Sequence, residues 1–573
     1  MLKTRASKDF WLLAITAVLV IGAGLGLRDP WPADEPRFAL VAKQMVSSGD
    51  WLFPHRGNEL YSDKPPMLMW LQALCYTLLG NWRVAFLLPS LLAALGTLAC
   101  VYDLGRRLWT RRVGAYAAWM LLFTLHFTFQ AKKAQIDPLV VFWITLANYG
   151  LLRHLLMGPA WRWWTLGWFA AGLGVITKGV GVIALLMLIP AGIAAARRWP
   201  GVRVYVRDRR FWLGPLFFFV AIGLWFVPMM VAALTAGQPE YRVYLNDILL
   251  RQTAKRYASS WDHAQPIWYH LQSMATLWLP TILLLPWAVP AWRRRLRRRD
   301  PRYLLPLGWW LLVLVFFTIP SGKRDVYILP ALPMFCLALA PLAPGLLRRV
   351  GVQRLLFGFG LLLAALFGAG GAAMLIGHPG FEQKIMDSRG VGSEATGPLG
   401  WLLLAVGLWG IASLLLLQVR RSALALVSLL GAWWVAFGLV CYPIFNDSSS
   451  ASAVMREAGH RIGPDAQLGL VAWKEQNLLM ADRPAQTFGF KVPWEQQLQR
   501  GVAWQRQRPA QRWLMVQETA LLTCVDRSRS QLVGVANRRR WWLVPVDAVH
   551  GDCMANSRER AVEAKEQGNL DTE

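Results

Sequence analysis

Long apolar runs dominate this chain and constrain its fold more than any other feature. About thirteen segments of roughly 16–25 residues are apolar enough to cross a bilayer, which needs about 20 helical residues. Only 16% of the 573 residues are charged and 55% are hydrophobic, a balance that soluble proteins of several domains do not show. We therefore expect an all-α polytopic membrane protein. Its spans are expected at approximately residues 10–27, 82–104, 113–129, 134–155, 163–177, 179–196, 211–233, 273–292, 303–319, 326–343, 352–376, 398–418 and 422–443.

The positive charge of the chain is concentrated in the loops between these runs. The net charge is +28, which would suit nucleic acid, but the arginines cluster in every second loop. The clusters are Arg106-Arg107 with Arg111-Arg112, Arg197-Arg198 to Arg209-Arg210, Arg293 to Arg299, Arg348-Arg349 and Arg420-Arg421. Cytoplasmic loops of membrane proteins carry an excess of Lys and Arg. The pattern therefore predicts a cytoplasmic N-terminus and, with an odd number of spans, an outer C-terminus. Membrane orientation explains the charge without nucleic acid as a partner.

Two outer loops are long, and the chain ends in a segment of different character. Loops 28–81 and 234–272 face the same side as the tail in this topology. The tail mixes short apolar runs with polar turns, which predicts a small α/β domain. We therefore divide the chain into a transmembrane domain, 1–445, and a C-terminal domain, 446–573. If the latter is extracytoplasmic, its Cys524 and Cys553 could form one disulfide.

The first long loop begins with an acidic pair, Asp34-Glu35. The stretch Glu35–Ser47 has apolar residues at helical spacing, which suits a helix on the membrane surface, and Pro66–Leu79 is a second amphipathic stretch. Asp34 before Glu35-Pro36 also suits a helix N-cap. For Asp34 taken alone, capping is as good an explanation as catalysis.

Ionisable residues recur at the outer ends of other spans. They are Asp63-Lys64, Asp137, Lys178, Arg251, Arg256, and Lys323 with Tyr327 in a short loop. Charged groups are costly beside hydrocarbon and usually serve chemistry or substrate contact, and orientation does not explain arginines on the outer face. A lipid-linked anionic substrate would account for this gathering. Asp137 before Pro138 also suits a helix cap, and His126, inside an apolar run, is interpreted as structural.

Four of these stretches resemble the GT-C membrane glycosyltransferases, which use polyprenyl-phosphate-linked sugars. The closest branch is the aminoarabinose transferases that modify lipid A, which are also related to protein O-mannosyltransferases. The stretches are Asp34 to Ala39, Gly49-Asp50-Trp51 through Lys64 to Pro66, Ala134 to Pro138 with Thr177 to Gly179, and Gly322-Lys323 through Tyr327 to Pro330. Thirteen spans followed by an outer domain is also that family's layout. The likeness covers the whole chain and is more specific for the family than for the substrate.

The resemblance implies roles for single residues in sugar transfer. Asp34 matches the family's essential first-loop aspartate, and Asp137 is a second catalytic candidate. The expected ligands of the donor phosphate are Lys64, Lys323, Tyr327 and either Arg251 or Arg256, between which the register stays open.

Other positions are carried over with less definite roles. Glu35 and Lys178 are further site candidates. Asp63 stands where the aminoarabinose enzymes carry a glutamate that binds a metal, so Asp63 and His263 are candidate ligands of a divalent metal. Pro36 replaces the usual threonine. The differences from the family pattern at positions 36 and 63 concern the binding of the metal and the identity of the transferred sugar.

The implied activity is an inverting transfer of 4-amino-4-deoxy-L-arabinose from undecaprenyl phosphate to lipid A. It would take place at the periplasmic face of the bacterial inner membrane, without a nucleotide cofactor, and the chain has no GxGxxG or P-loop pattern. The alternatives are transfer of a hexose or another amino sugar to a glycan or protein, a transporter or flippase, and a membrane scaffold. Transporters place polar groups near the midplane, whereas here they gather at one face. A scaffold leaves the outer-face arginines unexplained.

Overall fold

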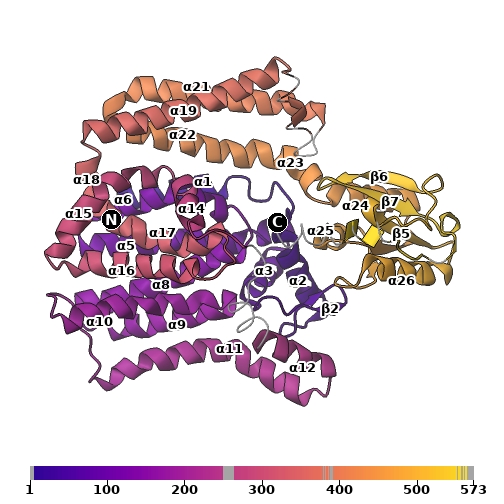
Figure 1. Ribbon diagram of the computed structural model, residues 1–573, viewed down its shortest axis with the longest axis horizontal. Helices are drawn as coiled ribbons and strands as arrows, with labels where there is room; N and C mark the ends of the chain where they lie inside the picture. Colours follow the sequence, from indigo (N-terminus) through magenta and orange to yellow (C-terminus); the bar gives the residue numbers. More distant parts are fainter. Residues whose placement is uncertain are drawn as a thin grey trace.

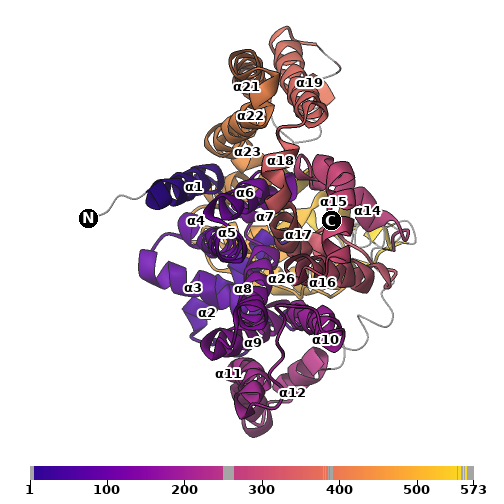
Figure 2. The same ribbon diagram turned by 90° about the vertical axis from the view of Figure 1, so that its left-hand side faces the viewer.

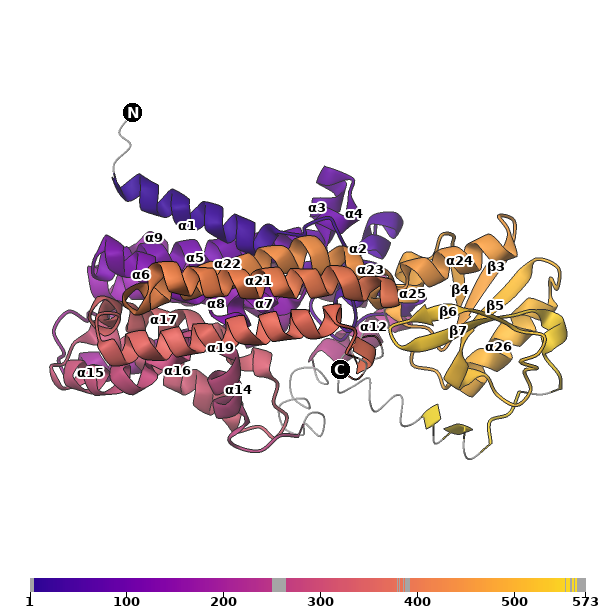
Figure 3. The ribbon, with the colours of Figure 1, turned by 90° about the horizontal axis from the view of Figure 1, so that it is seen from above.

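A long bundle of apolar helices carries a small mixed α/β domain at one end (Figure 1). This computed structural model describes residues 5–249, 264–378, 380, 382–384, 386, 392–551, 553–556, 559–560 and 562–563. Helix α1 begins at the end of the bundle that is far from the α/β domain (Figure 3). The fold class predicted from the sequence, a multi-span helical protein with a C-terminal α/β domain, is confirmed.

The bundle contains long helices that run along the long axis of the molecule, together with shorter helices that are more steeply inclined. They are α1 (Arg5–Gly22), α5 (Leu88–Leu108), α6 (Arg111–Leu122), α7 (Leu125–Ala131), α8 (Ile136–Met157), α9 (Trp161–Lys178), α10 (Leu188–Ala196), α11 (Leu213–Thr235), α14 (Tyr269–Leu277), α15 (Leu285–Arg297), α16 (Pro301–Thr318), α17 (Leu332–Leu339), α18 (Ala343–Leu346), α19 (Val350–Leu375), α21 (Thr396–Leu417), α22 (Ser422–Ala436) and α23 (Tyr442–Ser449). Seen along the helices (Figure 2), α19, α21 and α22 form one edge, α9 and α11 the other, and α5, α6, α8 and α17 the centre.

Every expected span coincides with a helix or a helix pair, but not all are long and apolar enough to cross a membrane alone. Among the described residues, 8 helices meet that measure, or up to 9 if α14 and the bent segment Thr281–Arg297 form one span. The other expected spans correspond to α1, α6 with α7, α9, and the segment Val180–Ala196, which are shorter or more polar. These pieces are stabilised by packing against the longer helices, because short helices gain most of their stability from tertiary contacts.

The first outer loop folds into two helices and a small hairpin at the end of the bundle nearest the α/β domain. These are α2 (Glu35–Ser48), α3 (Met67–Leu79), the short α4 (Trp82–Ala85), and the strands β1 (His55–Arg56) and β2 (Glu59–Leu60). The expectation that α2 lies on the membrane surface is wrong, because its apolar face, including Phe38 and Val41, is buried against protein. Helix α3 instead exposes Leu74 and Leu78, as an interfacial helix does.

The C-terminal domain is a five-stranded sheet with the order β4-β3-β5-β7-β6. Its elements are α24 (Ser452–Ile462), β3 (Gln467–Val471), α25 (Glu475–Met480), β4 (Ala485–Thr487), α26 (Trp494–Arg506), β5 (Arg512–Gln517), β6 (Gln531–Ala536) and β7 (Arg539–Val544). Strand β3 is parallel to β4 and β5, and β7 is antiparallel to β5 and β6. Helix α25, which follows β3, packs against α2, so the carboxyl end of β3 faces the bundle. The expected disulfide between Cys524 and Cys553 is present.

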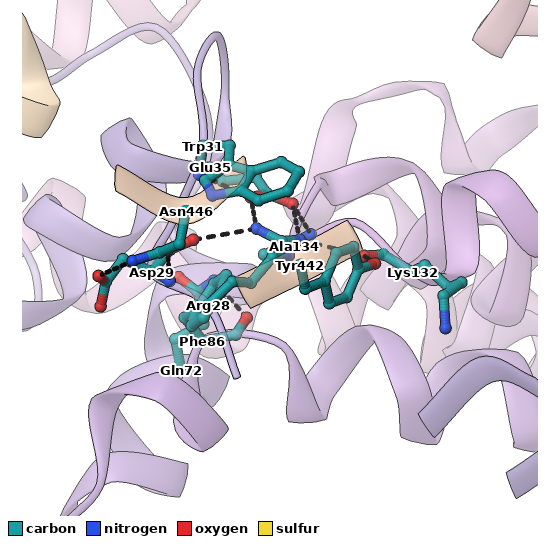
Figure 4. A network of polar contacts seen from close by, with 10 residues as sticks. All are labelled: Arg28, Asp29, Trp31, Glu35, Gln72, Phe86, Lys132, Ala134, Tyr442 and Asn446. Carbon is teal, nitrogen blue, oxygen red and sulfur yellow. Dashed lines mark hydrogen bonds and ion pairs between the residues drawn. The ribbon is translucent and has the colours of Figure 1, made fainter. Parts of the chain in front are cut away.

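A buried ion pair fixes the start of the first loop (Figure 4). Arg28 binds both carboxylate oxygens of Glu35, and the two residues are only 2% and 4% exposed. The guanidinium of Arg28 also donates to the carbonyl of Lys132 at 3.1 Å and lies 4.8 Å from the ring centre of Tyr442. Three distant segments therefore meet on one cation: the first loop, the loop between α7 and α8, and the beginning of α23.

The neighbouring lysine closes the end of the first span. The ammonium of Lys132 donates to the carbonyls of Val20, Ile21 and Ala23 at 2.9–3.1 Å. These carbonyls belong to the last turn of α1 and the residue after it, where a helix has unsatisfied acceptors and a partial negative charge. The short α7–α8 loop is thus anchored to both α1 and Arg28.

We predict that Arg28→Met destabilises the protein by about 3–5 kcal/mol, because it leaves Glu35 buried without its counter-charge. The double variant Arg28→Met/Glu35→Met should be less destabilised than the single variant, since no charge is then left unpaired. The readout is the unfolding midpoint of the detergent-solubilised protein. Arg83→Met is the control, because Arg83 is half-exposed and its pair with Asp29 should be worth about 1 kcal/mol or less. Equal losses for the single and double Arg28 variants would contradict this account.

Candidate active site

The carboxylate of Asp34 lies where the first loop meets the start of α8. Asp34 precedes α2 but makes no capping hydrogen bond, so the capping explanation is wrong. Its Oδ2 accepts a hydrogen bond from the side chain of Gln135 at 3.2 Å, and its Oδ1 lies 3.6 Å from Arg37. Gln135 precedes α8, which carries Asp137 in its first turn. The two carboxylates predicted to be catalytic are therefore brought to the same end of the bundle.

Glu35, one residue further on, is engaged in structural contacts. Besides Arg28, its carboxylate accepts hydrogen bonds from the backbone amides of Trp31 and Ala134, both at 2.9 Å. With this set of donors and 4% exposure, Glu35 has the environment of a buried structural carboxylate. Asp34, by contrast, keeps 21% of its side chain exposed.

Asp137, Lys178 and Tyr327 come together from three separate segments. Lys178, the last residue of α9, forms an ion pair with Asp137. Its ammonium also lies 5.3 Å from the ring centre of Tyr327, within the range of a cation–π contact. Tyr327 belongs to a short 3-10 helix, η5 (Asp325–Ala331), that leads into α17. The structure thus groups three of the residues that the sequence singled out.

Two residues that the sequence did not place in the site lie between these groups. His126 is fully buried, and its Nε2 is 3.9 Å from the carboxylate of Asp325. Neither of its ring nitrogens has a hydrogen-bond partner among the described residues. Lys133 is mostly buried, which lowers its pKa, while the charges of Glu35, Asp325 and Asp34 oppose that shift. Lys133 lies in the short outer loop 130–133. Membrane orientation does not explain a cation on that face, and this was the one sequence signal that could have identified Lys133.

The second half of the first loop forms an ionic junction with the C-terminal domain. Glu475, the first residue of α25, accepts a hydrogen bond from Arg37 at 2.9 Å and lies 3.5 Å from Arg56. Asp63 lies 3.6 Å from Arg56 and 3.7 Å from Lys491. Burial alone would raise the pKa of Asp63, but these cations hold it below its ordinary value. Arg37, which lies 3.6 Å from Asp34, is therefore also held by Glu475 of the C-terminal domain.

Tyr61 is a further polar group in this region. It is 1% exposed, and its hydroxyl has no hydrogen-bond partner among the residues that the structure describes. Burial raises the pKa of Tyr61 well above its usual value, and the charges of Arg37, Asp63 and Asp34 act on it as well. Tyr61 is therefore a neutral hydrogen-bond donor close enough to Asp34 and Asp63 to feel their charges.

The predicted metal ligands are only partly covered by the structure. Asp63 is surrounded by cations, and His263 lies outside the described residues. Within the described ranges, no group of three His, Cys, Asp or Glu side chains could hold a metal ion. Metal binding by Asp63 and His263 stays a prediction.

The surroundings of the predicted phosphate ligands are described in part. Lys64 follows Ser62, whose hydroxyl donates to Asp247 at 3.0 Å. Asp247 ends α12 (Pro239–Asn246), in the second long outer loop. Arg251 and Arg256 lie outside the described residues, so neither can be assigned to the phosphate.

Lys323 makes contacts of a different kind. It is 5% exposed, and its ammonium donates to the carbonyl of Gln265 at 3.0 Å and to that of Ser321 at 3.4 Å. These bonds tie its loop to the segment before α14. The contacts that Lys323 makes in the structure hold two loops together. Its role as a ligand of the donor phosphate stays a prediction.

We predict that Glu475→Gln weakens the junction between the first loop and the C-terminal domain by about 2 kcal/mol, because two arginines lose their shared charge. Hydrogen exchange of α25 and of residues 55–64 should accelerate, while exchange in the bundle core stays unchanged. Glu518→Gln is the control, since Glu518 also pairs with two arginines, Arg527 and Arg540, neither of which belongs to the first loop. Unchanged exchange in Glu475→Gln would show that this carboxylate does not hold the junction.

The chain is similar in sequence and in fold to known glycosyltransferases. A family model described as dolichyl-phosphate-mannose-protein mannosyltransferase matches residues 63–227. The undecaprenyl phosphate-alpha-4-amino-4-deoxy-L-arabinose arabinosyl transferase of Pseudomonas aeruginosa is 30% identical over 424 residues, which is 72% of this chain and 71% of that protein. The second such transferase of Sodalis glossinidius is 29% identical over 378 residues, 63% of this chain and 64% of the relative. That alignment spans less than two thirds of the relative's length.

A solved structure covers nearly the whole chain. The crystal structure of ArnT from Cupriavidus metallidurans bound to undecaprenyl phosphate superposes with a TM-score of 0.70. The match covers 96% of this chain and 100% of that one at 18% identity, so it establishes the common fold. The chain belongs to the family of the undecaprenyl phosphate-alpha-4-amino-4-deoxy-L-arabinose arabinosyl transferases, membrane glycosyltransferases of the GT-C fold.

Proposed function

We propose that this protein transfers 4-amino-4-deoxy-L-arabinose from undecaprenyl phosphate to lipid A at the periplasmic face of a bacterial inner membrane. The observation that carries the proposal is the convergence of Asp34 with Gln135 and of Asp137 with Lys178 and Tyr327 at one end of the bundle. The names of the relatives supply the donor and the sugar. The arginine-rich loops at the other end of the bundle support a cytoplasmic position for that end, and therefore a periplasmic position for the site.

The reaction we propose is a displacement at the anomeric carbon of the sugar. An oxygen of the acceptor forms the new bond to that carbon, and the bond to the phosphate oxygen breaks with its electron pair, so undecaprenyl phosphate leaves. Lys64, Tyr327 and an arginine of the second outer loop stabilise the charge on the leaving phosphate. An acceptor phosphate needs no strong base, so positioning would supply a large part of the rate.

The acidic residues have separate roles in this proposal. Asp34, which is partly exposed and held by Gln135 and Arg37, orients the acceptor or takes its proton. Asp137 balances the charge of Lys178, which keeps that cation beside the ring of Tyr327. The hydroxyl of Tyr327 is then available for a phosphate oxygen.

Another sugar or acceptor is the alternative within the same chemistry. A relative that attaches a hexose or another amino sugar to a glycan or protein would use the same phosphate ligands and the same acidic residues. The transporter alternative is weaker, because the ionisable groups described above gather at one end and not at the midplane, and because the chain belongs to a glycosyltransferase family.

Mass spectrometry of lipid A from cells with and without the gene tests the proposal directly. We expect lipid A from cells that carry the gene to be heavier by the mass of one or two aminoarabinose residues. Loss of a different mass would identify another sugar. Identical spectra, together with a missing modification on another glycan or protein, would contradict lipid A as the acceptor.

We predict that the same type of substitution lowers the transfer rate at Asp34 and lowers the stability at its neighbour Glu35. Asp34→Asn should lower the transfer rate by about a hundredfold or more, because it removes a catalytic carboxylate, while thermal stability is retained. Glu35→Gln should lower thermal stability, since it breaks the buried pair with Arg28. Turnover and the unfolding midpoint are both measured on purified protein. Near-normal turnover of Asp34→Asn would remove Asp34 from the catalytic role.

A second variant tests the assignment of the phosphate ligand. Lys64→Ala should weaken donor binding by about tenfold or more, since it removes a charged phosphate contact, and should leave acceptor binding nearly unchanged. Lys43→Ala is the control, because Lys43 lies in the same loop and donates to the carbonyl of Leu479. Equal weakening of donor and acceptor binding by Lys64→Ala would refute the assignment.

A further inference from the structure

The turn between β6 and β7 is strongly basic. Strand β6 ends at Ala536, which pairs with Arg539 at the start of β7, so Asn537 and Arg538 form a two-residue turn. The stretch 531–544 contains three consecutive arginines, Arg538 to Arg540, and no acidic residue. We call this turn, with its three arginines, the basic hairpin.

Hydrogen bonding fixes the height of the basic hairpin relative to the membrane. The amide of Asn537 donates to the carbonyl of Ser448 at 2.9 Å. Ser448 is in the last turn of the candidate span Val419–Ser449, which has 31 residues. Both Figure 1 and Figure 3 place β6 and β7 beside the end of α23.

The length of that span exceeds the thickness of the hydrocarbon. A helix of this length covers about 46 Å, whereas the hydrocarbon core is about 30 Å thick. The span begins with Arg420 and Arg421, whose charges belong among the headgroups of the first leaflet. Its last turns therefore reach the headgroup layer of the opposite leaflet. The basic hairpin, bonded to Ser448, lies at the level of these headgroups.

The side chains of the turn are directed to the surface. Arg538 is exposed and has a φ of 60°. This is a left-handed conformation, for which two-residue hairpin turns usually have glycine. Val535, one residue before the end of β6, is 49% exposed. Arg456 on the adjoining α24 is also exposed, and its side chain bonds back toward Ser452 near the bundle. Arginines beside an exposed aliphatic side chain suit the boundary between phosphates and acyl chains.

One carboxylate balances part of this charge. Glu518 lies 3.8 Å from Arg540, on the side of the hairpin that faces the loop after β5. The lipid contacts are assigned to Arg538 and Arg456, whose side chains are both exposed.

We propose that the basic hairpin, together with Arg456, binds the phosphate headgroups of anionic lipids in the leaflet next to the C-terminal domain. Each arginine near an anionic leaflet is worth about a fivefold gain in binding, and a guanidinium can hold a phosphate by two hydrogen bonds. The contact would hold the sheet domain against the membrane on the side of α23, while Glu475 holds it to the first loop. The inference rests on the position and charge of the hairpin and does not depend on the proposed donor or acceptor.

Hydrogen exchange of the full-length protein in nanodiscs tests this proposal. The probes are nanodiscs of phosphatidylcholine alone and nanodiscs in which about one third of the lipid is phosphatidylglycerol. We expect the amides of Asn537 to Arg540 to exchange severalfold more slowly in the anionic nanodiscs at low salt. High salt should remove the difference, because it screens the charges.

Matched variants separate lipid binding from general charge. Arg456→Gln/Arg538→Gln should abolish the extra protection, and Arg456→Lys/Arg538→Lys should retain part of it. The control Arg508→Gln/Arg529→Gln removes the same charge from the starts of β5 and β6, about 20 Å along the strands from the turn, and should keep the full protection. Equal exchange in neutral and anionic nanodiscs, or an equal loss in the control variant, would overturn the proposal.

Discussion

The buried pair of Arg28 with Glu35 is the contact on which the arrangement of the site depends. Removing two charges from water is costly, and the cost is offset only where the geometry is good and the remaining polar atoms are satisfied. Here Glu35 also accepts hydrogen bonds from two backbone amides, and aromatic rings enclose the guanidinium of Arg28. Because one of these amides belongs to Ala134, the pair sets the first loop against the start of α8. That contact brings Asp34 within reach of Gln135.

Two layers of contacts then hold the first loop. Inside the bundle, the Arg28 network and Lys132 join it to α1, α8 and α23. On the outer side, Glu475 holds Arg37 and Arg56 from 438 and 419 residues away along the chain. Asp34 sits between these layers, since it contacts Gln135 on one side and Arg37 on the other. A carboxylate fixed in this way needs little reorganisation during the proposed transfer.

The sequence predicted the membrane helices well, because apolar length is a local property that survives folding. It also predicted that Asp137, Lys178 and Tyr327 gather at one face, because all three stand at the outer ends of spans. Without the family resemblance, the residue types alone could not distinguish Asp34 from Glu35, since the difference arises from Arg28 and Ala134, which only the fold brings near. For the same reason α2 was assigned to the membrane surface: its apolar face has the right period, but the neighbouring helices cover it. Lys133 and Tyr61 were not singled out, and His126 was interpreted as structural, because burial next to charges is a tertiary property.

The central claim is that side chains from distant segments form one site for a lipid phosphate at the end of the bundle next to the C-terminal domain. A structure of the protein with bound undecaprenyl phosphate tests it most directly. The account predicts phosphate oxygens within about 3.5 Å of both Lys64 and the hydroxyl of Tyr327, with Asp34 facing the same cavity. A phosphate bound among the arginine clusters at the other end, or contacting neither Lys64 nor Tyr327, would contradict it.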